Sequence, residues 1–353
     1  MTERSTPRLS IILPTLDEAH SLPVLLQQLR AQQRLDCEII VADGGSRDRT
    51  IELARHADVR IVESARGRGR QMNAGAAQAH GEFLLFLHAD SKIESHLLLA
   101  NALTALTQEF ERAGHSRIAG HFPLRFFETN AASTRFYRHV EGKTRLNRPY
   151  TINGDQGLLI HAAFFAQLGG FDERLPFLED QRIAAEIFKQ GRWMVLPDTL
   201  LTSARRFEQE GRRERYTLMA LIMGLHAARV EDFFVRAPGV YAAQNESARV
   251  QLQPILQLIR KLFAERGLLQ TLAILYRVGQ FVRENAWQLA YWRDQANDAQ
   301  DLPRLKFYDR WLEPLTRNVV ADLLATILVS VWFFVWLPLQ LQRSDSIQDK
   351  DLG

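Results

Sequence analysis

The chain has 353 residues, of which 46% are hydrophobic, 44 are lysine or arginine and 41 are aspartate or glutamate. This length fits about two domains, and the near-average globular composition excludes a disordered chain or a disulfide-built miniprotein. A formal charge of +3 on a chain this long does not indicate nucleic-acid binding. The single cysteine, Cys37, lies in an apolar run, which is typical of a buried thiol in a reducing, cytoplasmic setting.

Short apolar runs alternate with helical patterns in the N-terminal part of the chain. We expect strands at 9–14, 37–42, 60–62 and 82–88, with helices near 18–34, 48–57 and 70–80. Strands separated by helices at this spacing predict βαβ units and a mostly parallel sheet covered by helices on both faces. Ligands of such sheets bind beyond the carboxyl ends of the strands, so the residues that follow each strand are the candidates for function.

Strands become sparser farther along the chain and then end. We expect strands at 117–127, 156–162 and 192–196, and a helix at 180–190 that ends at Gly191; from about residue 211 the pattern is helical. The predicted fold class is therefore α/β with a mostly parallel, Rossmann-like sheet and a helical C-terminal extension. The expected domains are a catalytic domain over 1–235, a helical extension over 236–318 and an apolar helix over 319–341.

The segment 323–339 has no charged residue and contains Trp332, Trp336 and Pro338. Its length is at the short limit for a transmembrane helix. Three interpretations remain open: a single membrane span, a helix lying in the membrane interface, and a buried or dimer-forming helix. If the segment spans, the cations that precede it place the large N-terminal part in the cytoplasm. We therefore expect the protein at the cytoplasmic face of an inner membrane or in the cytoplasm.

Carboxylates follow the first two expected strands. After the first come Pro14, Asp17 and Glu18, where a carboxylate could accept hydrogen bonds from a base or ribose, although Thr15 with Glu18 also forms a helix capping box. Asp43 ends the second strand ahead of two glycines that permit a tight turn and close approach of a ligand. This segment fits nucleoside binding, but a plain turn that precedes a capped helix would look the same.

Arginines alternate with glycines after the third expected strand. Arg66, Arg68 and Arg70 stand at the mouth of a helix that contains Asn73. Backbone N–H groups at a helix N-terminus and guanidinium groups suit a diphosphate. The third glycine of a dinucleotide fingerprint is replaced by Met72, and no Walker lysine follows. A solvated basic loop without a ligand remains the alternative.

The fourth expected strand ends in His88, Ala89 and Asp90. His88 and Asp90 lie on one side of an extended chain, and imidazole and carboxylate both coordinate Mn²⁺ or Mg²⁺. Asp90 could equally be a turn residue before a capped helix. Farther on, Glu179 and Asp180 open a helix with a buried apolar face. Acidic residues favour a helix N-terminus without any function, but a general base fixed at a helix tip would also look like this.

Together these motifs resemble those of family 2 glycosyltransferases with the GT-A fold. The resemblance runs over about residues 9–207 and rests on IILPTLDE at 11–18, DGGSxDxT at 43–50, GxxxNxG at 69–75, LHAD at 87–90 and the Glu179–Asp180 pair. The arginine-glycine loop and the His-Ala-Asp variant are similar to the bacterial branch of radical-SAM/selenodomain-associated transferases.

The resemblance implies a nucleotide-diphosphate sugar donor, favouring a UDP-sugar. It implies that Asp43 contacts the nucleoside, that a divalent metal (Mn²⁺ or Mg²⁺) is held at Asp90, and that Asp180 deprotonates the acceptor hydroxyl. His88 replaces the first aspartate of the family's D-x-D motif, so metal dependence is in question, and the arginine loop offers a substitute charge. The Q-x-x-R-W motif of processive synthases is absent, since residues 203–207 read SARRF, which favours single addition.

We therefore expect an inverting transfer of one sugar to a small-molecule or lipid-linked acceptor, with the inner-membrane surface as a partner and no nucleic acid. Three alternatives remain open, of which a dinucleotide oxidoreductase is disfavoured by the broken glycine pattern after the third strand. A sugar-phosphate nucleotidyltransferase shares the α/β plan but usually has a glycine-rich loop after its first strand, and residues 14–18 contain no glycine. The third is a non-catalytic, membrane-tethered protein that binds a nucleotide-sugar.

Overall fold

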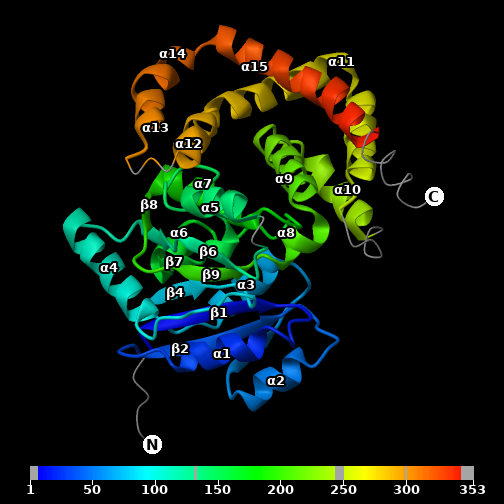
Figure 1. The fold of residues 1–353 in the computed structure, drawn as a ribbon. Coiled ribbons are helices and arrows are strands. Elements are labelled where there is room, and N and C mark those ends of the chain that lie inside the picture. Colours follow the sequence, from blue (N-terminus) through cyan, green and yellow to red (C-terminus); the bar gives the residue numbers. More distant parts are fainter. Residues whose placement is uncertain (1–6, 131–132, 243–249, 298, 300, 343–353) are drawn as a thin grey trace, which may run out of the picture. The chain divides into compact units, whose positions relative to one another are not determined.

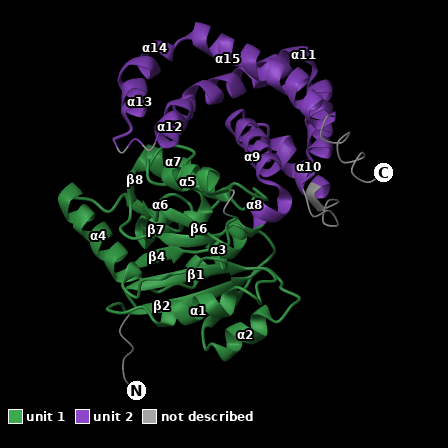
Figure 2. Cartoon of the chain, in the orientation of Figure 1, with its two compact units in different colours: residues 1–205 green, residues 206–353 purple. Residues whose placement is uncertain are grey.

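The computed structural model describes residues 7–130, 133–242, 250–297, 299 and 301–342. The chain divides into two compact units, residues 1–205 and residues 206–353 (Figures 1 and 2). The first unit holds all of the strands in the described residues, and the second is helical. The predicted α/β class, with a mostly parallel sheet followed by a helical region, is confirmed. The division falls after Arg205, whereas the domain predicted from the sequence runs to residue 235.

The central sheet of the first unit has the strand order β3-β2-β1-β4-β7-β5-β8. Its strands are β1 (Leu9–Thr15), β2 (Cys37–Asp43), β3 (Arg60–Glu63), β4 (Phe83–Phe86), β5 (Ile118–His121), β7 (Leu158–His161) and β8 (Arg192–Val195). Strand β1 pairs in parallel with β2 and β4, whereas β7 is antiparallel to both of its neighbours. The carboxyl ends of β1, β2 and β4 therefore meet at one edge.

The strand expected over 117–127 is wrong as a single element. It divides into β5 and β6 (Leu124–Phe127), and β6 leaves the central sheet to pair in parallel with β9 (Leu200–Ser203). Pro123 stands at the break, where its lack of an N–H and fixed φ interrupt a ladder. Strand β9 was not predicted from the sequence. The other expected strands are confirmed, with bounds that shift by a few residues.

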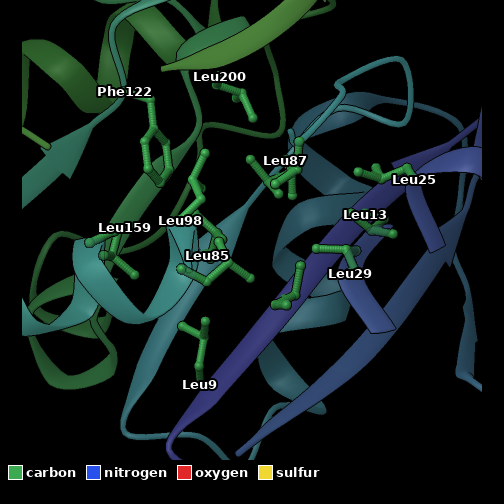
Figure 3. Close-up of a cluster of buried hydrophobic side chains, with 14 of the residues drawn as sticks. Leu9, Leu13, Leu25, Leu29, Leu85, Leu87, Leu98, Phe122, Leu159 and Leu200 are labelled. Atoms are coloured by element: carbon green, nitrogen blue, oxygen red, sulfur yellow. The ribbon is translucent and has the colours of Figure 1, made fainter. Parts of the chain in front are cut away.

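Helices cover both faces of the sheet, because alternate side chains of β1 point to opposite faces and each set belongs to its own apolar core. Ile11 and Leu13 belong to a core with helices α1 (Leu22–Arg30) and α4 (Leu98–Ala113), whereas Ile12 belongs to a core with α3 (Arg68–Ala77) and α7 (Glu179–Gln190). Figure 3 shows part of the first core, in which Leu13 lies near Leu25 and Leu29. The close approach of α3 to β1 requires Gly75, where an added Cβ would lie 2.5 Å from Ile12.

Among its described residues, the first unit also contains the helices α2 (Thr50–His56), α5 (Thr134–Lys143), the short 3₁₀ helix η2 (Gly154–Gln156) and α6 (Ala162–Gln167). The expected helix at 180–190 is α7, which ends at Gly191 as predicted.

The second unit consists of helices, and α8 (Arg205–Glu210) crosses the division. The larger ones are α9 (Arg212–Ala227), α10 (Glu231–Ala242), α11 (Leu252–Glu284), α12 (Trp287–Ala296) and α15 (Val319–Val331), and the shorter ones are α13 (Pro303–Phe307), η3 (Tyr308–Leu312), α14 (Glu313–Thr316) and η4 (Trp332–Trp336). Helix α15 lies along α11 (Figure 1). The helix Val319–Gln342 is long and apolar enough to cross a membrane by length and composition.

Candidate active site

The loops singled out in the sequence follow successive parallel strands and meet at the carboxyl edge of the sheet. Thr15 at the end of β1 lies opposite Asp43 at the end of β2, and β4 borders β1 on its other side. This is the edge at which open α/β sheets bind ligands. The topology therefore brings the four predicted loops to one place.

Asp43 is buried at the end of β2, with 3% of its surface exposed. Its Oδ2 accepts hydrogen bonds from the backbone N–H groups of Gly45 and Ser46, both at 2.8 Å, and its Oδ1 accepts one from the Thr15 hydroxyl at 3.1 Å. The carboxylate thus holds the tight turn that follows β2. Gly45 has φ of +91°, the conformation that glycine adopts without strain.

The loop after β1 is bonded to the loop after β2. The Asp17 carboxylate accepts from the Arg47 N–H at 2.7 Å, and the Glu18 N–H donates to the Thr50 hydroxyl at 2.8 Å. Asp17 has φ of +57°, an uncommon value for a residue other than glycine. Pro14 is buried within β1. The two loops form one rigid ledge beside the strand ends.

Gln71 ties this ledge to α3, and its role was missed in the sequence. Its buried amide donates to the backbone carbonyls of Thr15 at 2.6 Å and Ala42 at 3.0 Å, so one side chain joins the ends of two neighbouring strands. Gly44 is required beside it, because a Cβ there would lie 2.9 Å from the Gln71 side chain. Gln71 is the fourth residue of α3, directly after the basic loop, and its sequence context gives no signal for such a contact.

The three arginines of the basic loop have different environments. Arg66 and Arg70 are exposed, whereas Arg68 is partly buried at the start of α3 and lies 3.4 Å from the Glu179 carboxylate. Burial opposes the Arg68 charge, but the carboxylates of Glu179, Asp155, Asp180 and Asp90 outweigh it and raise the Arg68 pKa above its ordinary value. Arg68 is therefore a fixed cation surrounded by four carboxylates.

Asn73 joins α3 to the loop before α7. Its amide accepts from the Phe171 N–H at 2.9 Å and donates to the Phe171 carbonyl and to the Glu173 carboxylate, each at 2.9 Å. An added Cβ at Gly170 would lie 2.7 Å from the Asn73 carbonyl oxygen. In this structure the Asn73 side chain is thus occupied by contacts that position the loop leading to α7.

His88 lies against η2. Its Nδ1 is 2.8 Å from the Asp155 carboxylate, and its side chain is 13% exposed. Gly154 separates the His88 ring from Asp180: a Cβ there would lie 2.8 Å from His88 Nε2 and 3.5 Å from Asp180 Oδ2. The Gly154 N–H donates to Asp180 at 2.7 Å. Asp155 and Gly154 were not among the predicted site residues.

Glu179 and Asp180 stand at the first turn of α7 with unequal exposure. Glu179 is 1% exposed, and burial raises its pKa although the Arg68 charge opposes the rise. Asp180 is only partly buried. Leu178 before them has φ of +67°, a strained conformation for a branched residue.

A pocket that is open to solvent joins these groups. His88, Asn153, Gly154, Glu179 and Asp180 form its polar lining. Its apolar lining is formed by Met72, Phe86, Ile152, Leu158, Phe171, Ile183 and Trp193. A mostly apolar pocket with a few convergent polar groups is typical of a small-molecule site. The Glu179 and Asp180 carboxylates in its lining are acid–base groups, and the guanidinium of Arg68 beside Glu179 could bind an anionic ligand.

The predicted metal ligands do not form a metal cage by themselves. In the parts of the chain that the structure describes, no group of three or more His, Cys, Asp or Glu side chains could hold a metal ion. The Nδ1 of His88 is engaged with Asp155, and Ala89 is buried between His88 and Asp90. A cation here would need ligands from a bound molecule.

Open α/β sheets bind ligands at this edge, and comparison with known proteins shows which family part of this chain resembles. Residues 10–167 match the model of glycosyl transferase family 2. A PGL/p-HBAD biosynthesis glycosyltransferase of Mycobacterium bovis is 35% identical over 96 residues, covering 25% of this chain and 38% of that protein. The GalNAc(5)-diNAcBac-PP-undecaprenol beta-1,3-glucosyltransferase of Campylobacter jejuni is 32% identical over 122 residues, covering 32% of this chain and 38% of the relative.

Among solved structures, this chain is similar to the mannosyltransferase PcManGT from Pyrobaculum calidifontis in complex with GDP-Man and Mn²⁺. The match has a TM-score of 0.49 and 18% identity, and it covers 93% of this chain and 87% of that one. This chain spans 38% of the length of each of the two curated relatives described above. Residues 10–167, less than half of the chain, therefore resemble family 2 glycosyltransferases, as the sequence motifs implied. The narrower bacterial branch stays a prediction.

Proposed function

We propose that the protein transfers a single sugar from a nucleotide-diphosphate donor, with a UDP-sugar favoured, to the hydroxyl group of a small-molecule or lipid-linked acceptor, with inversion. The observation that carries this proposal is the position of Asp180. Its partly buried carboxylate lines the pocket and is held by the Gly154 N–H at 2.7 Å. Its other oxygen, Oδ1, accepts from the Gln181 N–H at 2.8 Å, so the carboxylate is fixed at the pocket wall, as suits a general base.

Asp180 rather than Glu179 is the proposed base because the two carboxylates differ in access. Glu179 is 1% exposed and pairs with Arg68 at 3.4 Å, so its role is to position that arginine. In the proposed step the acceptor oxygen bonds to the anomeric carbon while the bond from that carbon to the donor's phosphate oxygen breaks. The acceptor proton passes to Asp180, and the bonding electrons leave with the nucleotide diphosphate.

Arg68 is the proposed partner of the leaving diphosphate. It stands at the N-terminus of α3, where backbone N–H groups also favour an anion, and its side chain is 39% exposed toward solvent. Arg66 and Arg70 are exposed on the same loop and supply charge without a fixed position. Charge that develops on the leaving oxygen is thereby stabilised by a cation already in place.

A divalent cation fits the side chains of this edge only when the diphosphate of the bound nucleotide-sugar supplies some of its ligands. Four carboxylates surround Arg68, a surplus of negative charge that a cation would balance. Asp90, with His88 beside it, would hold the cation, and diphosphate oxygens would complete its coordination, as is common for Mg²⁺. When bound, the ion neutralises charge on the leaving diphosphate. Asp43 and the ledge of Asp17 and Glu18 would hold the nucleoside.

A thermal-shift screen of the full chain tests the proposal. UDP-, GDP- and dTDP-sugars are added with and without Mn²⁺, and a stabilising nucleotide-sugar raises the unfolding temperature by mass action. We expect a UDP-sugar to give the largest rise and Arg68→Ala to reduce it. The matched control is Arg192→Ala, an exposed arginine at the start of β8. No shift with any nucleotide-sugar would contradict the proposal, and pyrophosphate release from a nucleoside triphosphate would indicate a nucleotidyltransferase instead.

A further inference from the structure

The helix Val319–Gln342 has one apolar face that is exposed in the structure. Leu324, Ile327 and Leu328 are 58%, 59% and 70% exposed, and Trp336 is 57% exposed. Only 22% of the apolar stretch is buried. A contiguous apolar surface of this kind on a single chain marks a site of contact with a protein or a membrane.

The opposite face of the same helix is fixed to α11 along most of its length. Near its start, Asp322 pairs with Arg283 at 2.5 Å and accepts from Gln280 at 3.1 Å. Near its end, the ring of Phe333 lies 5.7 Å from that of Phe263. Since these contacts join residues 322–333 of the apolar helix to residues 263–283 of α11, α15 cannot change depth in a membrane without α11.

Close packing between Gly279 and Thr326, midway along their contact, also holds α11 and α15 together. An added Cβ at Gly279 of α11 would lie 2.7 Å from the backbone nitrogen of Thr326, so the two backbones approach closely at this crossing. Small residues at a helix crossing allow such approach. The pair is therefore one structural element.

Helix α11 in turn is tied to α10 by exposed ion pairs. Arg266 lies 2.8 Å from Asp232, and Glu265 lies 2.8 Å from Arg236. Charged groups are excluded from the hydrocarbon of a bilayer unless they line a polar cavity. A crossing of the membrane by α15 would carry these groups toward that region, whereas a helix that lies flat would leave them in water.

We propose that α15 lies in the plane of an anionic membrane, with its exposed face in one leaflet and α11 on the water side. The segment that leads into α15 supplies cations beside aromatic rings: Lys306 and Arg310 are exposed, and Phe307 and Trp311 are 56% and 54% exposed. Aromatic rings favour the headgroup region, and cations favour anionic lipids. This combination selects a lipid surface over a second copy of the chain. The inference does not depend on the proposed transferase activity.

Vesicle flotation of the full chain tests the docking. We expect binding to phosphatidylglycerol vesicles and weaker binding to phosphatidylcholine vesicles. The double variant Leu324→Asp/Leu328→Asp should lower the bound fraction at least tenfold, because each leucine loses its apolar contact with lipid. The matched control is Val235→Asp on α10, which is 78% exposed. No vesicle binding, or equal loss in the control, would overturn the proposal.

Cysteine labelling distinguishes a flat helix from a span. In a Cys37→Ser background, Asp301→Cys and Gln342→Cys place thiols before and after the helix, at exposed positions. A membrane-impermeant maleimide added to one side of sealed vesicles should label both variants or neither. Labelling of only one would show a span and overturn the in-plane arrangement. A stable dimer in detergent-free buffer that fails to bind vesicles would assign the face to a second copy.

Discussion

The substitution Gly154→Ala tests the arrangement of the polar pocket wall. The new Cβ would lie 2.8 Å from His88 Nε2 and 3.0 Å from its Cε1. The shorter distance is 0.6 Å below the 3.4 Å at which ordinary van der Waals contact begins. The His88 ring cannot withdraw without straining its 2.8 Å bond to Asp155. Alternatively the loop moves, and the 2.7 Å bond from the Gly154 N–H to Asp180 is lost.

Either movement should change two measurable quantities, the free energy of unfolding and kcat. Overpacking of this kind costs about 1–3 kcal/mol of unfolding free energy. A displacement of Asp180 by a fraction of an ångström should lower kcat by roughly 10- to 100-fold. Urea unfolding measures the first effect, and the rate of donor hydrolysis, which needs no acceptor, measures the second. The control is Gly239→Ala, where an added Cβ meets nothing within 4 Å.

A second variant isolates the contact. In a His88→Ala background the ring is absent, so Gly154→Ala should cost at least about 1 kcal/mol less than in the native chain, as a double-mutant cycle measures. Equal costs in the two backgrounds, or full activity of Gly154→Ala, would refute the proposed packing of His88 between Asp155 and Gly154.

Three further predictions concern stability. Gln71→Ala removes two buried hydrogen bonds and should cost about 1–3 kcal/mol in urea unfolding, whereas Gln78→Ala, exposed at the end of the same helix, should cost about 0.5 or less. Asp322→Ala leaves Arg283 without its buried partner; a loss of about 3 kcal/mol should appear as faster amide exchange in α15. Burial, with the charge of Lys143 nearby, lowers the His139 pKa to about 4. The contribution of neutral His139 to the free energy of unfolding is therefore complete above about pH 6.5, and at most about 3 kcal/mol is lost as the pH falls toward 4. His139→Gln should flatten this dependence of unfolding free energy on pH.

Much of the first unit could be predicted from local sequence, because its signals are local. Apolar runs of strand length, separated by helices, predicted β1 to β4, and the parallel arrangement then placed the loops after them at one edge. The expected 117–127 strand failed because residues on either side of Pro123 pair with different sheets, and pairing partners lie far away in the sequence. Strand β9 was missed for the same reason.

The site was predictable only as a set of loops. Asp180 and Glu179 line one pocket with His88, and the different roles proposed for them rest on a difference in burial that the sequence does not reveal. Asp155 and Gly154 lie in a segment without a recognisable motif, and their contacts with His88 and Asp180 join residues 26 to 67 positions apart. Such contacts depend on the folded chain.

The measurement that tests the central claim most directly is sugar transfer by Asp180→Asn, made together with calorimetric titration of the donor. Glu186→Gln on the same helix is the matched control. Because Asp180 is proposed to take the acceptor proton, the variant should bind the nucleotide-sugar with unchanged affinity and lose transfer by roughly 10²- to 10⁴-fold. Undiminished transfer by Asp180→Asn, with the donor bound as in the native chain, would contradict the account.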